Sequence, residues 1–368
     1  MKKKVCWITA TYFLDVDLPI VPKLMDYFSI DWKIITSRNL MESDRKYILS
    51  QTDKSFELIT SESRFFTYQH FIFLKSLIIN ISNQNYDWIY LDISDYLFLF
   101  PLVKKYLGNE KVTIATHNVS IPKGARLPYL AKLSMGYIIR NFKHFQVFSK
   151  NQEKILRKKS ENSDIFYCPL MLKDYGHKNE RVESTLTRFL FFGNIIPYKR
   201  VDILLNAINL LVEEGITNFK VDICGYCKPD VWISKYLPLI KYPDYVNCDI
   251  RRIPNELVSS YFNKNDYFVM PYQDIAQSGA MTVALNYNIP IIASNLDTFT
   301  EFISHKKNGY LFSQGSVEEL ANAMRWAIAN SPQDYCNLKL NLKKMVDDNL
   351  ATDTIVNKYL KYFTKCLN

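Results

Sequence analysis

The stretch RFLFFGNIIPYKRVDILLNAINLL, residues 188–211, decides the fold. It predicts a β-strand over residues 189–192, a turn at Gly193 and an amphipathic helix from about Asp202. The loop before the helix carries two cations, Lys199 and Arg200. The first N–H groups of a helix lack intrahelical partners and carry partial positive charge, so they stabilise a phosphate. The stretch therefore indicates a diphosphate site.

A second stretch, MPYQDIAQSGAMTVALNYNIPIIAS at residues 270–294, repeats this arrangement. Its strand runs over residues 267–270, and a polar loop then leads through Ser278 and Gly279 into a helix that spans residues 280–286. The two stretches together predict two loops at the same edge of one parallel sheet.

Short β-branched or aromatic runs alternate with helical stretches along the whole chain. The runs in the first half are Val5 to Thr9, Trp32 to Thr36, Phe56 to Thr60, Trp88 to Asp92, Val112 to His117 and Phe145 to Ser149. Those in the second half are Phe189 to Phe192, Val221 to Gly225, Tyr245 to Ile250, Tyr267 to Met270 and Ile289 to Ser294. The pattern predicts an α/β fold with two facing Rossmann-like domains and a cleft between them. We expect domains at 1–182 and 183–345, a polar linker over 173–184, and a C-terminal helix at 346–368 that returns to the first domain.

Composition agrees with two domains of ordinary make, because 368 residues exceed what one hydrophobic core organises. The seven cysteines are an odd number spread thinly, which argues against a disulfide framework and favours a reducing cytoplasm. The lysines before the apolar run 5–14 imitate a signal peptide, but two threonines and the missing cleavage site favour a buried strand. We expect no transmembrane segment, since every apolar stretch is short or broken by charge.

The positive charge is concentrated in the first half of the chain. Residues 1–185 hold 27 Lys and Arg against 19 Asp and Glu, whereas residues 186–368 hold 19 against 18. Within the first half, residues 123–159 interleave basic with apolar and aromatic side chains, as expected of a segment that rests on anionic lipid headgroups. An ordinary amphipathic core helix with solvated lysines fits this segment equally well. Nucleic acid is a weaker alternative, because no RNA- or DNA-binding motif accompanies the charge.

In its second half, over roughly residues 186–330, the chain resembles the retaining, nucleotide-sugar-dependent glycosyltransferases of family 4, glycosyl transferases group 1, which have the GT-B fold. The resemblance rests on several motifs that occur in family order. These are the glycine turn with its basic loop, the D-I-C-G strand end at Gly225, N-E-L at 255–257, N-D-Y-F-V-M-P-Y at 265–272, the Q-S-G helix start, N-I-P-I-I-A-S, Glu301, and N-G-Y-L-F ending at Phe312. In the first half, Thr116-His117-Asn118 stands where the family has a histidine after a strand.

The resemblance implies a hexosyltransferase that moves a sugar from a nucleoside diphosphate sugar with retained configuration and without a metal or other cofactor. The second domain binds the donor and the first faces the acceptor. Lys199 would act on the leaving diphosphate, because a fixed ammonium there stabilises the charge that develops in the transition state. His117 would lie near the transferred sugar. Its bland alternative is a strand-end histidine bonded to a backbone carbonyl. The expected donor-binding residues are Gly193, Asn194, Arg200, Gly225, Asp274, Gln277, Ser278, Gly279, Thr282 and Glu301.

The chain departs from the family pattern at the donor site. Asn194 replaces one of the two basic residues, unless Arg200 swings in to replace it. The two family glutamates fall on Ile275 and Val283, whose side chains accept no hydrogen bond. Either other polar side chains take over the sugar and ribose contacts, or catalysis has been lost. The candidates for that takeover are Asp274, Gln277 and Thr282.

Three other patterns have competing interpretations. Cys224-Gly-Tyr-Cys227 looks like a thiol redox motif, but its place at a strand end favours structural cysteines. Asp15-Val-Asp17 has the spacing of a metal-binding pair, although a solvated or acceptor-binding loop fits better beside a GT-B second half. Glu301 either bonds the nucleotide, as the family suggests, or belongs to a solvated helix start.

We therefore predict a cytoplasmic glycosyltransferase, peripheral on the inner face of the plasma membrane. Its acceptor would be a lipid-linked oligosaccharide of a surface polysaccharide such as O-antigen or capsule. Two alternatives stay open: a catalytically silent sugar-binding or scaffold protein of a polysaccharide assembly, and a GT-B epimerase acting on a free nucleotide sugar. The epimerase requires a carboxylate-rich cleft, which the sequence does not indicate.

Overall fold

The computed structural model describes residues 2–37, 40–61, 66–94, 97–121, 127–176 and 186–368. By contacts the chain divides into two compact units. Among the described residues, the first unit comprises those up to Ile121, those from Leu127 to Met171, and Thr352–Asn368. The second unit is Leu172–Ala351. The predicted linker over 173–184 lies partly outside the described residues.

The first unit contains a seven-stranded sheet in the order β3-β2-β1-β4-β5-β6-β7, and all of its strand pairs are parallel. Its strands are β1 Lys4–Ala10, β2 Ser29–Ser37, β3 Glu57–Ser61, β4 Trp88–Asp92, β5 Val112–Thr116, β6 His144–Val147 and β7 Asp164–Tyr167. The six predicted strands are confirmed, within a few residues at each end. The four-residue edge strand β7 was missed, because only one of its residues is fully buried and it lacks a clear hydrophobic period.

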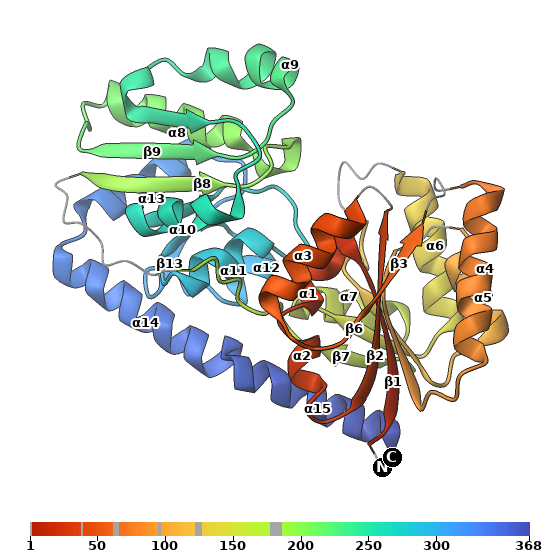
Figure 1. Cartoon of the computed structure of the whole chain (residues 1–368). Helices are drawn as coiled ribbons and strands as arrows, with labels where there is room; N and C mark the ends of the chain where they lie inside the picture. Colours follow the sequence, from red (N-terminus) through yellow and green to blue (C-terminus); the bar gives the residue numbers. More distant parts are fainter. Residues whose placement is uncertain (1, 38–39, 62–65, 95–96, 122–126, 177–185) are drawn as a thin grey trace. The chain divides into compact units, whose positions relative to one another are not determined.

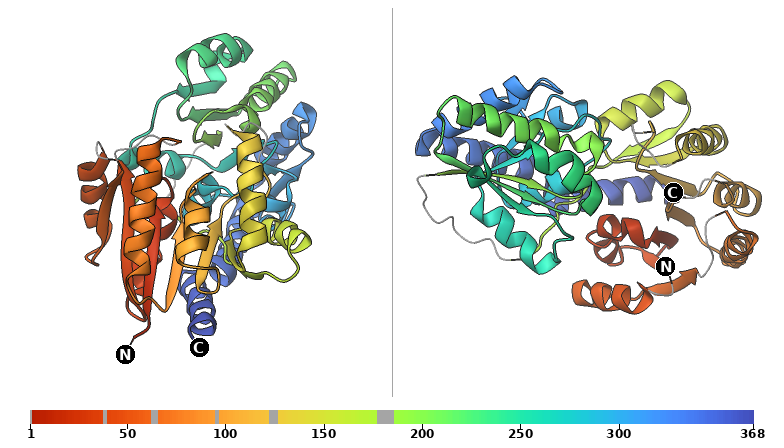
Figure 2. Two further views of the ribbon diagram at one scale, coloured as in Figure 1. Left: turned by 90° about the vertical axis from the view of Figure 1, so that its right-hand side faces the viewer. Right: turned by 90° about the horizontal axis from the view of Figure 1, so that it is seen from above.

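Helices cover both faces of this sheet (Figure 1). They are α1 Leu14–Asp17, α2 Val21–Leu24, α3 Met41–Gln51, α4 Tyr68–Ser82, α5 Leu99–Tyr106, α6 Pro128–Asn141, α7 Lys150–Lys159 and α15 Thr352–Leu367. Side chains of β1 alternate between the faces, so Cys6 and Ile8 pack with α4, α5 and α6, while Val5 and Trp7 pack with α1, α2, α3 and α15. Figure 2 shows α4, α5 and α6 together in front of the strands. Because β1 is buried on both faces, its continuous apolar run is that of a central strand.

The basic segment 123–159 is not a single helix. Its described part holds α6, the buried strand β6 and α7. The strand interrupts the helical period, so the expectation of one amphipathic core helix is wrong. Both helices bury apolar side chains, whereas three of the five basic residues of α7, Arg157, Lys158 and Lys159, lie in its last turn, where the helix dipole favours positive charge.

The second unit contains a six-stranded parallel sheet in the order β10-β9-β8-β11-β12-β13. Its strands are β8 Thr187–Phe192, β9 Phe219–Cys224, β10 Val246–Asp249, β11 Tyr267–Met270, β12 Ile291–Ser294 and β13 Gly309–Phe312. Its helices are α8 Val201–Glu213, α9 Pro229–Val231, α10 Asn255–Lys264, α11 Gly279–Asn286, α12 Asp297–Thr300, α13 Val317–Ala329 and α14 Pro332–Leu350. One hydrophobic cluster joins both faces of this sheet to the helices, and α8 packs against α13.

Both sheets reverse their strand order once, and ligands of open α/β sheets bind beyond the carboxyl ends of the strands at such a reversal. In the first unit the reversal lies between β1 and β4. In the second unit it lies between β8 and β11, where the two quoted stretches deliver their loops. Within the described ranges, no helix is both long and apolar enough to span a membrane.

Candidate active site

Two glycine turns meet where β8 and β9 end. Gly193 and Gly225 have φ angles of 117° and 140°, a region that side-chain-bearing residues rarely adopt. The Gly193 N–H donates to the Cys224 carbonyl oxygen at 2.9 Å. A Cβ atom on Gly225 would lie 2.2 Å from the Gly193 carbonyl oxygen, so the two backbones approach too closely for any side chain. The D-I-C-G strand end therefore permits the Gly193 turn.

Lys199 is a buried cation beside this turn. Lys199 ends the 3₁₀ turn Pro197–Lys199, and only 9% of the residue is exposed to solvent. The Nζ atom lies 5.3 Å from the centroid of the Tyr272 ring and 2.9 Å from where a Cβ on Gly193 would stand. No carboxylate among the described residues pairs with this ammonium, and burial lowers the pKa of Lys199 to about 8. A buried ammonium without a counter-ion indicates a site for an anion.

The helix α8 begins directly after Lys199. Its N-cap residue Arg200 adopts the left-handed conformation with φ 51°, and its side chain caps none of the first N–H groups. Instead the guanidinium donates to the Asp202 carboxylate, with Nε at 3.0 Å from Oδ1 and Nη2 at 2.8 Å from Oδ2. In the chain without ligand, Arg200 is thus held at the helix start by a neighbour. Its predicted role toward a diphosphate stays a prediction.

The second loop ends at the N-terminus of α11. Ser278 caps the helix by accepting a hydrogen bond from the Met281 N–H at 3.2 Å, and the Thr282 hydroxyl donates to the Gly279 carbonyl at 2.7 Å. Gly279 leaves space that a lysine side chain fills, since the Lys173 Nζ lies 2.9 Å from where a Cβ on Gly279 would stand.

A backbone hydrogen bond joins the two loops, because the Gln273 N–H donates to the Tyr198 carbonyl at 2.7 Å. Between them lies the buried Tyr272, whose hydroxyl has no hydrogen-bond partner among the described residues. Asp274, Gln277 and Glu301 are half-buried, and Asn194 is exposed.

The two apolar departures serve the protein core. Val283 is buried in the hydrophobic cluster of the second unit, and Ile275 packs against that cluster. The Thr298 hydroxyl donates to the Ile275 carbonyl at 2.9 Å and so ties the loop between β11 and α11 to α12. Side-chain contacts to a donor at these two positions are replaced by packing. The predicted takeover by Asp274, Gln277 or Thr282 stays a prediction, although the Thr282 hydroxyl already has an acceptor within its helix.

His117 follows β5 in the first unit and is buried between two phenyl rings. Phe13 stacks on one face with ring centroids 3.7 Å apart, and Phe148 stacks on the other at 4.5 Å. The Nε2 atom lies 2.7 Å from the Asp92 Oδ1 atom, so one ring nitrogen is bonded to a carboxyl group. Burial lowers the pKa of His117 to about 4.

The expectation of a solvated loop at Asp15-Val-Asp17 is wrong for Asp17. This residue ends the short helix α1 and is fully buried, because the Trp7 Nε1–H and the Thr9 hydroxyl both donate to its Oδ2 atom. These hydrogen bonds turn the side chain inward, where desolvation raises the pKa of Asp17 well above its usual value.

The Cys224-Gly-Tyr-Cys227 motif holds two free, buried thiols. Burial raises the pKa of Cys224 to about 12, and it raises that of Cys227 as well. A thiol with a raised pKa stays protonated and is a poor nucleophile, so the environment is that of structural cysteines.

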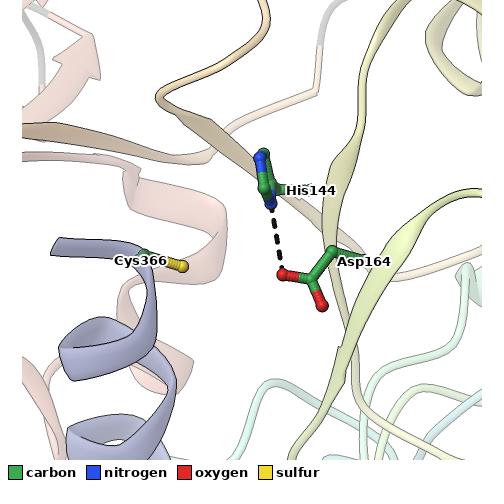
Figure 3. A group of neighbouring side chains, drawn as sticks. All are labelled: His144, Asp164 and Cys366. Carbon is green, nitrogen blue, oxygen red and sulfur yellow. Dashed lines mark hydrogen bonds and ion pairs between the residues drawn. The ribbon is translucent and has the colours of Figure 1, made fainter. Parts of the chain in front are cut away.

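Within the described residues, one group of side chains has the atoms to hold a metal ion, namely His144, Asp164 and Cys366 (Figure 3). His144 and Asp164 begin β6 and β7, at the edge of the sheet opposite to the strand ends that carry Asp92 and His117. The Lys365 ammonium donates to Asp164 at 2.7 Å, and burial raises the pKa of Cys366 to about 11. A neighbouring ammonium and a protonated thiol both disfavour a cation here. His144 and Asp164 instead bond to each other, and Asp164 also bonds to Lys365.

The structure places three further side chains, Asp92, Tyr272 and Lys173, beside predicted site residues. Asp92 carried a signal in the sequence, because it ends a predicted strand and so lies at the edge where ligands of such sheets bind. Tyr272 follows Pro271 in the second quoted stretch and was not singled out. Lys173 had no signal, since it lies in a segment assigned to the linker and reaches Gly279 only through folding.

Comparison with known proteins agrees with this geometry. Residues 187–330 match the model of the family described as glycosyl transferases group 1, and this span lies within the second unit. The match supports the glycosyl transferases group 1 family for this part of the chain. An uncharacterized glycosyltransferase of Haemophilus influenzae is 24% identical over 172 residues, which cover 46% of this chain and 47% of that protein.

A second relative is an uncharacterized 41.2 kDa protein in the cps region of Klebsiella pneumoniae. It is 23% identical over 190 residues, covering 51% of this chain and 48% of that protein. The chain thus spans about half the length of the curated relatives it matches.

Solved structures match the whole fold. Sucrose-phosphate synthase from Thermosynechococcus elongatus is 14% identical with a TM-score of 0.77, and the match covers 99% of each chain. HepE from Anabaena, solved with UDP and glucose, is 12% identical with a TM-score of 0.75, covering 99% of this chain and 100% of that one. At such identities the likeness concerns the fold. The chain has two parallel-sheet Rossmann-like domains that match GT-B glycosyltransferase structures.

Proposed function

We propose that the protein is a glycosyltransferase that takes its sugar from a nucleoside diphosphate sugar. The observation that carries this proposal is the buried Lys199 ammonium, which has no carboxylate partner among the described residues and lies beside the Gly193 turn. A diphosphate supplies the missing negative charge, and its departure develops more of it, so the ammonium stabilises the transition state more than the ground state. The uncharged Asn194 makes a second cation necessary.

Lys173 is that second cation. Its Nζ lies against Gly279, at the N-terminus of the eight-residue helix α11. The Lys199 and Lys173 ammonium groups would then face the diphosphate together with the N-termini of α8 and α11. Arg200 stays with Asp202 in this arrangement. The remaining donor contacts fall to Gly193, Gly225, Asp274, Gln277, Ser278, Thr282 and Glu301, as predicted from the sequence.

The finer features of the reaction follow the family 4 resemblance. We propose a hexosyltransferase that works with retention of configuration, with the protein's cations in place of a metal ion. Product stereochemistry determined by NMR, and activity in the presence of a chelator, test these two features. Inversion of the anomeric centre, or loss of activity on chelation, would contradict them. Because HepE is described in complex with UDP-glucose, UDP-glucose is the first donor to try.

For the acceptor we propose a lipid-linked oligosaccharide of a surface polysaccharide, at the inner face of the plasma membrane. Two observations support it. The second relative lies in a cps region. In addition, α6 turns Tyr129 and Leu133 outward, 85% and 68% exposed, beside the exposed Lys132 and Arg140. Aromatic and aliphatic side chains between basic ones suit an anionic headgroup layer.

Sedimentation with vesicles tests the membrane proposal. The wild-type chain should sediment with vesicles that contain anionic lipid, and a Tyr129→Ser, Leu133→Ser double variant should sediment less. Both side chains are exposed, so the variant should keep the wild-type unfolding temperature. Equal sedimentation of the two proteins, or none of the wild type, would refute it.

Thermal unfolding with a panel of nucleoside diphosphates tests the donor site. A nucleotide at about 100 times its dissociation constant should stabilise the native state by ~2.7 kcal/mol. The matched control is Lys199→Met, which keeps the length of the side chain and removes its charge. It should unfold at or above the wild-type temperature and show a smaller shift with nucleotide. An equal shift in both proteins would place the diphosphate elsewhere.

One observation favours a second candidate function, a catalytically silent sugar-binding protein. The family glutamates are replaced by Ile275 and Val283, which belong to the core. Donor turnover with a lipid-linked acceptor separates the two functions. A protein that binds nucleotide yet turns over no donor sugar, with or without acceptor, would support the silent one.

A further inference from the structure

Two buried carboxyl groups belong to one polar cluster in the core of the first unit. Asp17 at the end of α1 and Asp92 at the end of β4 are both fully buried. Their side chains belong to one cluster, because Thr9, which donates to Asp17, is the register partner of Asp92 across β1 and β4, and each carboxyl group acts on the pKa of the other. The Asp17 Oδ1 and Asp92 Oδ2 atoms have no hydrogen-bond partner among the described residues. Two buried carboxylates cannot both ionise within one cluster, because their repulsion adds to the cost of desolvation.

The other oxygen of each carboxyl group has a defined partner. The Asp17 Oδ2 atom accepts from the Trp7 Nε1–H at 2.8 Å and from the Thr9 hydroxyl at 2.5 Å. The Thr9 oxygen in turn accepts from the Trp32 Nε1–H at 2.9 Å, which directs its own hydrogen toward Asp17. Two donated hydrogen bonds favour the ionised form of Asp17. The Asp92 Oδ1 atom lies 2.7 Å from the His117 Nε2 atom.

We infer that Asp17 and Asp92 hold one proton between them, and that this proton keeps His117 a neutral imidazole with its hydrogen on Nε2 and Nδ1 as a hydrogen-bond acceptor. The proton resides on the Asp92 Oδ2 atom and is donated to the Asp17 Oδ1 atom. The Asp92 Oδ1 atom is then a carbonyl-like acceptor for the His117 Nε2–H. Asp17 and Asp92 are thus positioning residues that act through His117.

The surroundings of the ring agree with a neutral imidazole. Phe13 and Phe148 cover its two faces and exclude water. Burial raises the pKa of both Asp17 and Asp92 well above the usual value and lowers that of His117. The titratable groups that act on these three residues are Asp15 on α1, Tyr90 on β4 and Tyr359 on α15. Of these, only Asp15 is exposed, and its charge opposes the effect of burial on His117.

The arrangement matters for the reaction, a consequence that rests on the proposed glycosyltransferase function. A histidine bonded to an ionised aspartate becomes an imidazolium readily, and an imidazolium donates at both nitrogens. The shared proton prevents this state, so a donor sugar beside His117 would meet a neutral ring and not a cation across the working pH range.

A pair of isosteric variants tests the inference. In Asp92→Asn the amide Nδ2 donates to Asp17 and the amide oxygen accepts from His117, which reproduces the proposed protonation state. In Asp17→Asn the amide Nδ2 donates to Asp92 instead, which leaves Asp92 ionised beside His117. The two variants exchange a carboxyl for an amide at neighbouring positions, so each serves as the matched control for the other.

The readout is the ¹⁵N spectrum of the histidine rings as a function of pH. The chain has five histidines, and His117→Asn identifies the signals of His117. In the wild type and in Asp92→Asn, the His117 ring should stay neutral with a protonated Nε2 down to about pH 5. In Asp17→Asn its pKa should rise by about two units or more, through the unscreened Asp92 charge.

Either of two results would overturn the inference: a wild-type imidazolium at pH 7, or the same His117 pKa in the two variants. Circular dichroism and thermal unfolding establish that each variant is folded before its spectrum is interpreted. If a variant does not fold, the wild-type spectrum decides by itself. Because the spectra need no substrate, they test the shared proton even if the glycosyltransferase assay fails. Conversely, a neutral His117 in a protein without turnover leaves the inference intact and refutes only the proposed function.

Discussion

The two units of this protein build parallel sheets with the same strand order, apart from the added strand β7, and place opposite charges at the corresponding point of each. Each sheet reverses its strand order once, between β1 and β4 or between β8 and β11. At the first reversal, buried acids pair with each other and with a histidine. At the second, a buried lysine has no counter-ion among the described residues. The comparison shows that the backbone determines where a ligand binds, whereas a few side chains determine which ligand it is.

The two units differ in how their buried charges are neutralised. In the first unit a proton held between two carboxyl groups removes one charge, so the site is complete without a ligand. In the second unit the Lys199 charge is uncompensated until an anion arrives. Such an unpaired charge lowers the free energy of unfolding, and binding of an anion raises it.

The largest effect should come from removing the uncompensated cation. We expect Lys199→Met to lower the rate of sugar transfer about 10²- to 10³-fold, as loss of one fixed transition-state contact does. Its stability without ligand should rise by about 1–3 kcal/mol, because an unpaired buried charge is removed. Steady-state kinetics and urea unfolding measure the two changes. A destabilised variant would show that Lys199 has a counter-ion after all.

Removing the Lys173 charge should have a smaller effect than removing that of Lys199, since the Lys173 side chain is only half-buried. We expect Lys173→Met to weaken nucleoside diphosphate binding by about tenfold, the effect of one partly screened charge. Isothermal titration calorimetry measures it, with Lys235→Met on the surface of the second unit as the control. Equal affinities in the two variants would remove Lys173 from the site.

Gly225→Ala tests the close approach of backbones that permits the second site. The added Cβ would meet the Gly193 carbonyl at 2.2 Å, so we expect a loss of about 3 kcal/mol or more in the free energy of unfolding. Gly215→Ala is the control, because Gly215 also has a positive φ angle but nothing within 4 Å of its Cβ position. That variant should lose only about 1 kcal/mol. Similar losses in both would refute the steric argument.

Nucleotide binding to the second unit should depend on pH through the Lys199 ammonium. Burial lowers the pKa of Lys199 to about 8, whereas a bound diphosphate favours the charged form. Binding then takes up a proton above pH 8, and the dissociation constant should rise up to about tenfold per pH unit. Between pH 8 and the ordinary lysine pKa of 10.5, the unfolded chain binds more protons than the native one. The stability of the empty protein due to this group therefore rises with pH in that window, and Lys199→Met should remove both trends.

The smallest effect should come from Arg200. Its ion pair with Asp202 is partly exposed, so Arg200→Ala should change stability by less than about 1 kcal/mol and nucleotide affinity by less than about threefold. Nucleotide titration of this variant checks the expectation. A loss of affinity beyond about tenfold would mean that Arg200 leaves Asp202 and binds the diphosphate in the complex.

Much of the fold could be predicted because its signals are local. The alternation of buried strands and amphipathic helices determined a doubly wound α/β architecture, and the runs at 88–92 and 267–270 match β4 and β11 residue for residue. The four-residue edge strands β7 and β13 escaped, since each is only partly buried and too short to show a clear period. The glycine turn at Gly193 was likewise visible, because only glycine adopts its backbone conformation at low cost.

The sequence by itself thus determined two parallel sheets, the loops at their carboxyl edges, and Lys199 as the cation of the loop after β8. Only the tertiary structure decided which charges are compensated. It brought Asp17 against Asp92, bonded Asp92 to His117, placed Lys173 at Gly279 and left Lys199 without an acid among the described residues. The physical reason is the distance along the chain over which each property is determined. Backbone conformation depends on neighbours along the chain, whereas the energy of a buried charge depends on groups that only folding brings within a few ångströms.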